Sequence, residues 1–119
     1  MTTKELGDIG ENVATRFLRE KGLSILKRNY RFGKNEIDII YELPGKIVFV
    51  EVKTRESTAM GPPWKAVTVK KQKQIIKCAH HYIVTNDLDV EAQFDIISII
   101  RNKHGTFIEH IDDAFYPRM

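Results

Sequence analysis

Asp38, Glu51 and Lys53 are the residues whose types and spacing could do chemistry together. Two carboxylates offer the hard oxygen ligands that Mg²⁺ accepts, and water and a phosphate can complete its coordination. A lysine beside them can orient a water molecule and offset negative charge that grows on a phosphate. With the metal polarising the phosphate, this set suffices for hydrolysis of a phosphodiester bond. The chemistry requires that all three side chains meet on one face of the fold.

A β-hairpin is expected to bring these residues together. Residues 36–43 ("EIDIIYEL") alternate with apolar side chains on one face, and residues 46–55 ("KIVFVEVKTR") are rich in β-branched types. The apolar face of the first strand consists of Ile37, Ile39, Tyr41 and Leu43. Pro44-Gly45 separates the strands. This pair suits a type II turn and not the primed turns that match strand twist, so a loop longer than two residues is an alternative.

A hairpin that is symmetric about the Pro44-Gly45 bond places Asp38 directly opposite Glu51, and Glu36 opposite Lys53. Like charges in such a position repel, so a fold that keeps them usually places a cation between them. Either Lys53 or a divalent metal ion could be that cation. The alternative is a surface pair of Glu36 and Lys53, with both other carboxylates solvated.

Two helices are expected to flank these strands. An apolar stripe indicates a first helix that ends near Gly22, and it consists of Leu6, Ile9, Val13, Ala14, Phe17 and Leu18. Glu11 borders this stripe and is a further candidate metal ligand. A second helix is expected over residues 66–84, with Ile76, Ala79 and Ile83 on its apolar side.

The remaining patterns predict three more strands, so that the order is α-β-β-β-α-β-β. Residues 24–30 form a weak candidate, residues 92–100 ("AQFDIISII") a buried one, and residues 106–111 an alternating one. Helices that alternate with strands in this way favour an α/β fold with a mixed sheet flanked by helices. The length of 119 residues favours a single domain over residues 1–119.

Basic residues are concentrated in two segments, although the net charge is only +3. Residues 57–86 contain five lysines and no acid, and residues 16–34 contain seven basic residues and one acid. Such clustering is typical of proteins that bind nucleic acid through phosphate contacts. A solvated helix surface is the alternative. The candidates for phosphate contact are Arg28, Arg31, Arg55, Lys70, Lys71, Lys73 and Lys77.

Two features argue against a membrane or secreted protein. The longest apolar run, Ile47–Val50, has four residues, whereas a membrane helix needs about 20. Cys78 is the single cysteine, so an intrachain disulfide cannot form. We therefore expect a cytoplasmic protein that makes no membrane contact.

Five motifs follow one another in the order and spacing of a known bacterial family. They are "GENVATRFLREKG", "ILKRNYRFGKNEIDII", "IVFVEVKTR", "AVTVKKQKQI" and "QFDIISI". With them the chain resembles the YraN family, which is similar to the PD-(D/E)XK nuclease superfamily and to archaeal Holliday junction resolvases. The resemblance implies a restriction-endonuclease-like fold with Glu11, Asp38, Glu51 and Lys53 as active-site residues. Lys71 and Arg55 also match family positions, whereas Ile37 stands where the superfamily has proline.

The resemblance implies an endonuclease that cuts DNA with Mg²⁺ or Mn²⁺, with branched DNA as the substrate suggested by the resolvases. Resolvases cut two strands symmetrically, so a homodimer is expected if the chain shares that role. A fold can be kept without its activity, so a non-catalytic module that binds nucleic acid or a protein partner is the alternative. RNA remains open as a substrate because phosphate contacts are shared.

Overall fold

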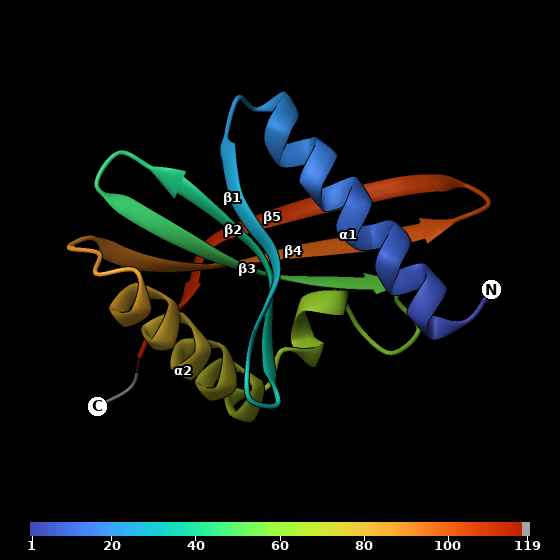
Figure 1. Cartoon of the computed structure of the whole chain (residues 1–119). Helices are drawn as coiled ribbons and strands as arrows, with labels where there is room; N and C mark the ends of the chain where they lie inside the picture. Colours follow the sequence, from blue (N-terminus) through green and yellow to red (C-terminus); the bar gives the residue numbers. More distant parts are fainter. Residues whose placement is uncertain (118–119) are drawn as a thin grey trace.

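The computed structural model describes residues 1–117 and has the expected mixed α/β architecture (Figure 1). Its elements are α1 (Thr3–Glu20), β1 (Ser24–Phe32), β2 (Asn35–Leu43), β3 (Lys46–Arg55), the short 3₁₀ helix η1 (Pro63–Ala66), α2 (Val69–Thr85), β4 (Glu91–Asn102) and β5 (Gly105–Phe115). The predicted order α-β-β-β-α-β-β is therefore confirmed. Within the described residues, neither helix is long and apolar enough to cross a membrane.

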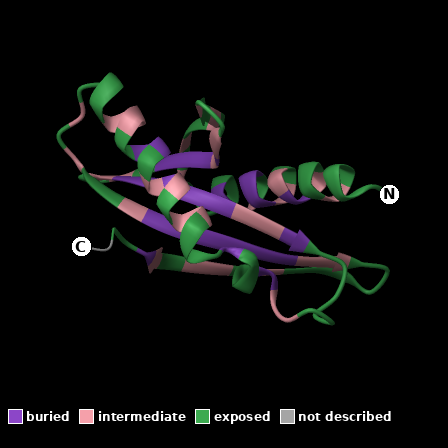
Figure 2. Ribbon diagram, turned by 90° about the horizontal axis from the view of Figure 1, so that it is seen from below, coloured by how far each residue is buried: buried purple, intermediate pink, exposed green. Residues whose placement is uncertain are grey.

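The five strands form one sheet in the order β1-β2-β3-β4-β5, and only the β3–β4 pair is parallel. The parallel pair requires a crossover, which contains η1 and α2. Alternate residues of β3 lie in two separate cores: Ile47 and Phe49 pack with α2, and Val48 and Val50 pack with α1. The two helices thus cover opposite faces of the sheet, and burial is greatest in its central strands (Figure 2).

The second helix begins later than the sequence suggests, because Pro63–Ala66 forms η1 and α2 starts only at Val69. Thr68 caps the helix, and its hydroxyl accepts a hydrogen bond of 3.2 Å from the Lys71 backbone N–H. The buried side of α2 consists of Ile75, Cys78 and Ala79, so of the three predicted core positions only Ala79 is fully buried. This small rotation of the apolar face decides which lysines of α2 point outward.

The β2–β3 loop has only two residues, so the longer alternative is wrong. Leu43 pairs with Lys46, and Gly45 has φ +74°, as the third position of a type II turn requires. The strand pair tolerates this turn, and the symmetric register predicted about the Pro44-Gly45 bond is confirmed for the five paired positions.

The single apolar face predicted for β2 is wrong at its beginning. Ile37 packs in the α2 core, whereas Ile39 and Tyr41 pack in the α1 core. On the neighbouring strand, Asn29 has φ +53°, a left-handed conformation that asparagine adopts more readily than most residues. The β1–β2 ribbon therefore changes direction near Asp38.

Helix α1 lies very close to the end of β3 at Gly10. A Cβ atom at this position would collide with the side chain of Thr54, so only glycine permits this approach. Ala14 and Leu18 are fully buried one and two turns further along the helix. This contact fixes the height of α1 above the sheet and with it the position of Glu11.

Candidate active site

The ladder between β2 and β3 opens at the candidate carboxylates. Pairing runs from Leu43 and Lys46 to Ile39 and Val50, and no further pair follows. Asp38 and Glu51 are the next residue on each strand. Figure 1 shows the β1–β2 hairpin turning away from β3 beyond this region. The two strands that separate here create the space in which the two carboxylates face each other.

Asp38 is held in this opening by the backbone of β3. Its Oδ2 accepts a hydrogen bond of 2.8 Å from the Val52 N–H, which lies beyond the last ladder pair. Burial raises the pKa of Asp38 well above its usual value, and the neighbouring Glu51 carboxyl raises it further. The Val52 N–H and the charge of Lys71 act in the opposite direction.

Glu51 is only 6% exposed, so its charge is costly without a partner. Among residues 1–117, its buried Oε2 has no hydrogen-bond partner. The nearest cation is Lys71 on α2, whose Nζ lies 3.5 Å from Oε2 in an ion pair. A buried carboxylate oxygen with an unfilled hydrogen-bonding capacity is suited to receive a cation.

Glu11 approaches the pair from α1, but it is tied to β1. Its Oε1 lies 3.3 Å from Arg28 Nη2, which also donates to Asn12 Oδ1 at 2.9 Å. Burial and the charge of Asp38 raise the pKa of Glu11, and Arg28 and Asn29 lower it again. Glu11 is therefore close enough to Asp38 for the two carboxylates to repel each other.

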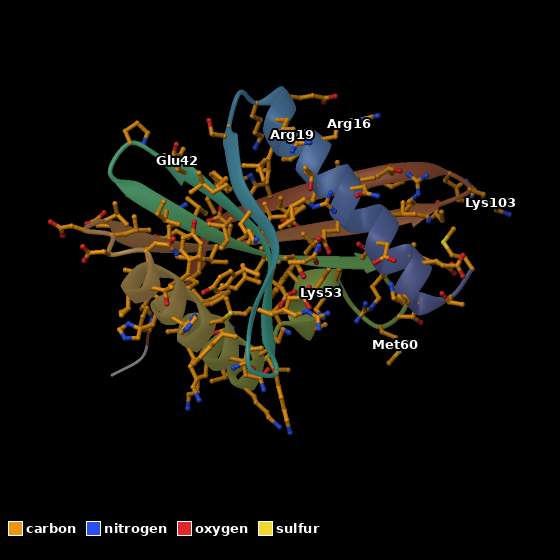
Figure 3. All side chains as sticks on the ribbon, viewed as in Figure 1. Arg16, Arg19, Glu42, Lys53, Met60 and Lys103 are labelled. Carbon is orange, nitrogen blue, oxygen red and sulfur yellow. The ribbon has the colours of Figure 1, made fainter. Side chains whose placement is uncertain are left out.

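Lys53 follows Glu51 by two residues on β3, so both side chains leave the same face of the strand. Figure 3 labels Lys53 near the centre of the molecule. In the described part of the chain Lys53 forms no ion pair, so the predicted contact with Glu36 is absent. Glu36 instead pairs with Arg31 of β1, with 3.3 Å between Oε2 and Nε, because β2 has already left β3 at this point.

The donor set fits Mg²⁺ as a two-carboxylate site. Within residues 1–117, no group of three or more Asp, Glu, His or Cys side chains has the spacing to hold a metal ion. Mg²⁺ is usually bound through one or two carboxylates and keeps several waters or substrate phosphates. Asp38 and Glu51, with the unpartnered Oε2, meet that requirement, and Glu11 would have to leave Arg28 to join them.

The seven basic candidates separate into two groups. Arg28, Arg31 and Lys71 each form an ion pair with a glutamate. The other four, Arg55, Lys70, Lys73 and Lys77, are exposed and form no ion pair within residues 1–117. The three lysines of this second group line a shallow depression between α2 and the start of β2, together with Asn35, Val69 and Gln74. A row of exposed lysines beside polar side chains is suited to phosphate contacts.

Sequence reasoning missed the inward direction of Lys71 and the part played by Asn29. A lysine in the first turn of a helix, within a basic run, gives no sign that it points at a buried glutamate. Asn29 carries one weak signal, since asparagine is enriched among residues with positive φ. Neither position could be assigned to the site before β1 and α2 were placed beside it.

Fold and site together define the chain as a small α/β protein with a carboxylate pair where its mixed sheet opens. Sequence comparison then identifies its family. The model of the uncharacterised protein family UPF0102 matches residues 10–99, and the chain belongs to this family, also called YraN. A UPF0102 protein of Christiangramia forsetii is 47% identical over 112 residues, 94% of each chain. One of Flavobacterium psychrophilum is 44% identical over 112 residues, also 94% of each. One of Geotalea daltonii is 47% identical over 114 residues, 94% of this chain and 90% of its own.

Proposed function

We propose that this protein is a metal-dependent endonuclease that hydrolyses phosphodiester bonds in DNA. The observation that carries the proposal is the meeting of Asp38 and Glu51 at the end of the β2–β3 ladder, with a buried carboxylate oxygen that no group of residues 1–117 hydrogen-bonds. Such a pair is costly to the fold, because like charges are brought together in a partly buried place. A fold that bears this cost gains a site for a divalent cation.

Each residue has a distinct role in the proposed reaction. Asp38 and Glu51 would hold the metal, which when bound polarises the scissile phosphate and stabilises charge on the attacking and leaving oxygens. Within the described residues Lys53 has no competing ion pair, so its ammonium group can donate hydrogen bonds to the attacking water or to a phosphate oxygen. The water oxygen bonds to phosphorus and releases a proton to solvent, as the bond to the leaving oxygen breaks and that oxygen takes up a proton from solvent. The exposed lysines of α2 would hold the DNA backbone.

The resemblance of the sequence motifs to those of the PD-(D/E)XK superfamily and of archaeal resolvases supports branched DNA as the substrate. Glu11, Asp38, Glu51 and Lys53, the four residues that this similarity implies, lie on α1, β2 and β3. Two symmetric cuts at a four-way junction need two such sites, so that substrate would require a homodimer.

Cleavage of labelled DNA tests the proposal directly. We expect wild-type protein with Mg²⁺ or Mn²⁺ to cut at least one member of a panel of linear, flapped and four-way-junction DNAs. Asp38→Asn and Lys53→Ala should each reduce the rate by about 100-fold or more, because each removes a group that acts on the transition state. The same reactions with EDTA should show no cutting.

Matched variants guard against contamination and unfolding. Lys46→Ala changes another lysine of β3, at the far end of the strand, and Asp89→Asn changes an exposed aspartate after α2. Both should cut as the wild type does. Activity that survives Asp38→Asn, or that falls equally in the control variants, would contradict the proposed site.

A non-catalytic binding module is the second candidate, and one observation favours it. Two of the three acidic residues of the opening already have a basic partner, since Arg28 pairs with Glu11 and Lys71 with Glu51. A charge-balanced site can persist without metal. This candidate predicts salt-sensitive binding of DNA or RNA with no cleavage of any panel member and no effect of EDTA.

A further inference from the structure

We propose that Lys71 is a built-in counter-ion of the Asp38–Glu51 pair, which leaves when a divalent cation binds and then contacts the DNA backbone. This inference rests on the metal site of the proposed function. It assigns Lys71 a positioning role that differs from that of the neighbouring lysines. It also predicts that metal loading and DNA binding strengthen each other.

The first step is the direction of the Lys71 side chain. Its Nζ lies 3.5 Å from Glu51 Oε2, the buried oxygen that has no hydrogen-bond partner among residues 1–117. The side chains of Lys71 and Glu51 are 34% and 7% exposed, so the pair reaches from the surface into the opening. Lys70, Lys73 and Lys77 of the same helix are exposed and form no ion pairs within the described chain.

The second step is the charge in the opening. Asp38 and Glu51 each follow the last pair of the β2–β3 ladder, Ile39 and Val50, so two like charges would meet there without a cation. Lys53 is not paired with either carboxylate, and Arg28 is held by Glu11 and Asn12. Lys71 is therefore the cation that balances the pair in the metal-free protein.

The third step is that a metal ion and Lys71 compete for one oxygen. Mg²⁺ binds a carboxylate oxygen at about 2.0–2.1 Å. An ammonium group that stays 3.5 Å from the same oxygen would then lie within a few ångströms of a dication, where repulsion is strong. Lysine has a flexible four-carbon stem, so Lys71 can swing outward while α2 stays in place.

The outward position of Lys71 adds a phosphate contact to the lysine row of α2. Lys70, its sequence neighbour, lines the depression with Lys73 and Lys77. When metal is bound, Lys71 joins these three cations at the surface. Linkage then requires that DNA raise the affinity for metal by the same factor by which metal raises the affinity for DNA.

Metal titration without DNA is the first test. Mn²⁺ binding is measured by calorimetry for wild type, Lys71→Met, Lys71→Arg and the matched surface variant Lys73→Met. Lys71→Met should bind Mn²⁺ about tenfold more tightly than wild type, because a competing cation is lost. Lys71→Arg and Lys73→Met should bind as the wild type does. Lys71→Gln, checked by circular dichroism, serves as a second neutral variant if Lys71→Met does not fold.

DNA binding at several salt concentrations is the second test, with EDTA and with Ca²⁺ in place of Mg²⁺. In EDTA, Lys71→Met should leave the log–log salt slope unchanged, whereas Lys73→Met should lower it by about 1. With Ca²⁺, both variants should lower it by about 1. The counter-ion role is overturned if Lys71→Met lowers the salt slope in EDTA, or if this variant binds Mn²⁺ no better than wild type. Either result would leave the proposed metal site standing.

The variant Asp38→Asn distinguishes a failure of the Lys71 inference from a failure of the metal site itself. If wild type binds Mn²⁺ and Asp38→Asn does not, the metal site stands and only the Lys71 results decide the inference. If wild type binds no Mn²⁺, or binds it as Asp38→Asn does, the metal site is absent and both proposals fall.

Discussion

At the scale of single residues, Asp38 shows a conflict between stability and function. Its raised pKa means that the folded protein holds the proton of this carboxyl more tightly than the unfolded chain does. The contribution of Asp38 to stability is thus fully present below the unfolded pKa of about 3.9 and is lost as pH rises through the raised folded pKa. At neutral pH the ionised group is a cost to the fold.

Asp38→Asn should therefore stabilise the metal-free protein at pH 8 by about 1 kcal/mol, a usual size for removal of an unfavourable charge. The asparagine oxygen can still accept the Val52 N–H, and its amide can donate to Glu51. The gain should shrink towards pH 4, where Asp38 of the wild type is protonated. Urea unfolding in EDTA at several pH values measures both effects.

Asp89→Asn is the control for this comparison, because Asp89 is exposed and forms no ion pair within residues 1–117. A loss of stability in Asp38→Asn at pH 8 would show that the carboxylate is favourable in the folded state. An equal gain at every pH would show that its titration is not the cause.

At the scale of elements, α2 presents its lysine row in one direction because its opposite side is fixed in the core. Ile75, Cys78 and Ala79 are buried, so Lys70, Lys73 and Lys77 are exposed together. The depression that they line lies at the start of β2, close to the hairpin that turns away from β3. A phosphate backbone held there would lie next to the element that carries Asp38.

We expect Lys70→Ala, Lys73→Ala and Lys77→Ala each to lower the slope of log affinity against log salt by about 1, since each removes one phosphate contact. Fluorescence anisotropy with labelled DNA between about 50 and 200 mM salt measures this slope. Lys103→Ala, in the β4–β5 turn, is the matched control (Figure 3). If all four variants keep the wild-type slope, the three lysines of α2 are only a solvated surface.

At the scale of the whole molecule, a second buried polar network holds distant parts of the chain together. Asp95 of β4 is fully buried. It accepts hydrogen bonds from Tyr41 Oη and His110 Nε2 at 2.7 Å and from Gln93 Nε2 and the Asp113 N–H at 3.0 Å. Lys21 Nζ, just after α1, lies 3.0 Å from His110 Nδ1. Because an ammonium can only donate, Nδ1 accepts and the Nε2 hydrogen goes to Asp95.

Burial works against the charge of Asp95, but the donors from His110, Gln93, Tyr41 and Asp113 outweigh it and lower the pKa of Asp95. Its contribution is therefore present above the unfolded pKa of about 3.9 and is lost as pH falls through the lowered folded pKa. Asp95→Asn should lower the free energy of unfolding by about 3 kcal/mol at pH 7, because buried hydrogen-bond donors lose a charged acceptor.

Urea unfolding checks this prediction, with Asp89→Asn as the control that should unfold as the wild type does. The difference in the free energy of unfolding between Asp95→Asn and wild type should become smaller below pH 4, because Asp95 of the wild type then becomes protonated. Asp95 packs on the α1 face of the sheet, whereas Glu51 lies on the α2 face. The folded Asp95→Asn protein should therefore bind Mn²⁺ with wild-type affinity. A stable Asp95→Asn variant with weaker metal binding would contradict this separation of the two networks.

The sequence by itself determined the elements and most of the pairing. Alternation and β-branched residues predicted β3 with its correct bounds, and the symmetric turn predicted the register that leads to Asp38 and Glu51. Those signals are local, because side-chain period and turn geometry act over a few residues. The same local reasoning failed at Glu36 and Ile37, where β2 leaves its partner and the period no longer describes the contacts.

Only the tertiary structure decided which charges meet. Gly10 against Thr54 fixes α1, the left-handed Asn29 helps to turn the β1–β2 ribbon, and the packing of α2 directs Lys71 to Glu51. These contacts join residues that are distant in the sequence, and each depends on the relative placement of whole elements. A pattern of residue types predicts what a segment forms, whereas the partner of a buried charge depends on which segment lies across from it.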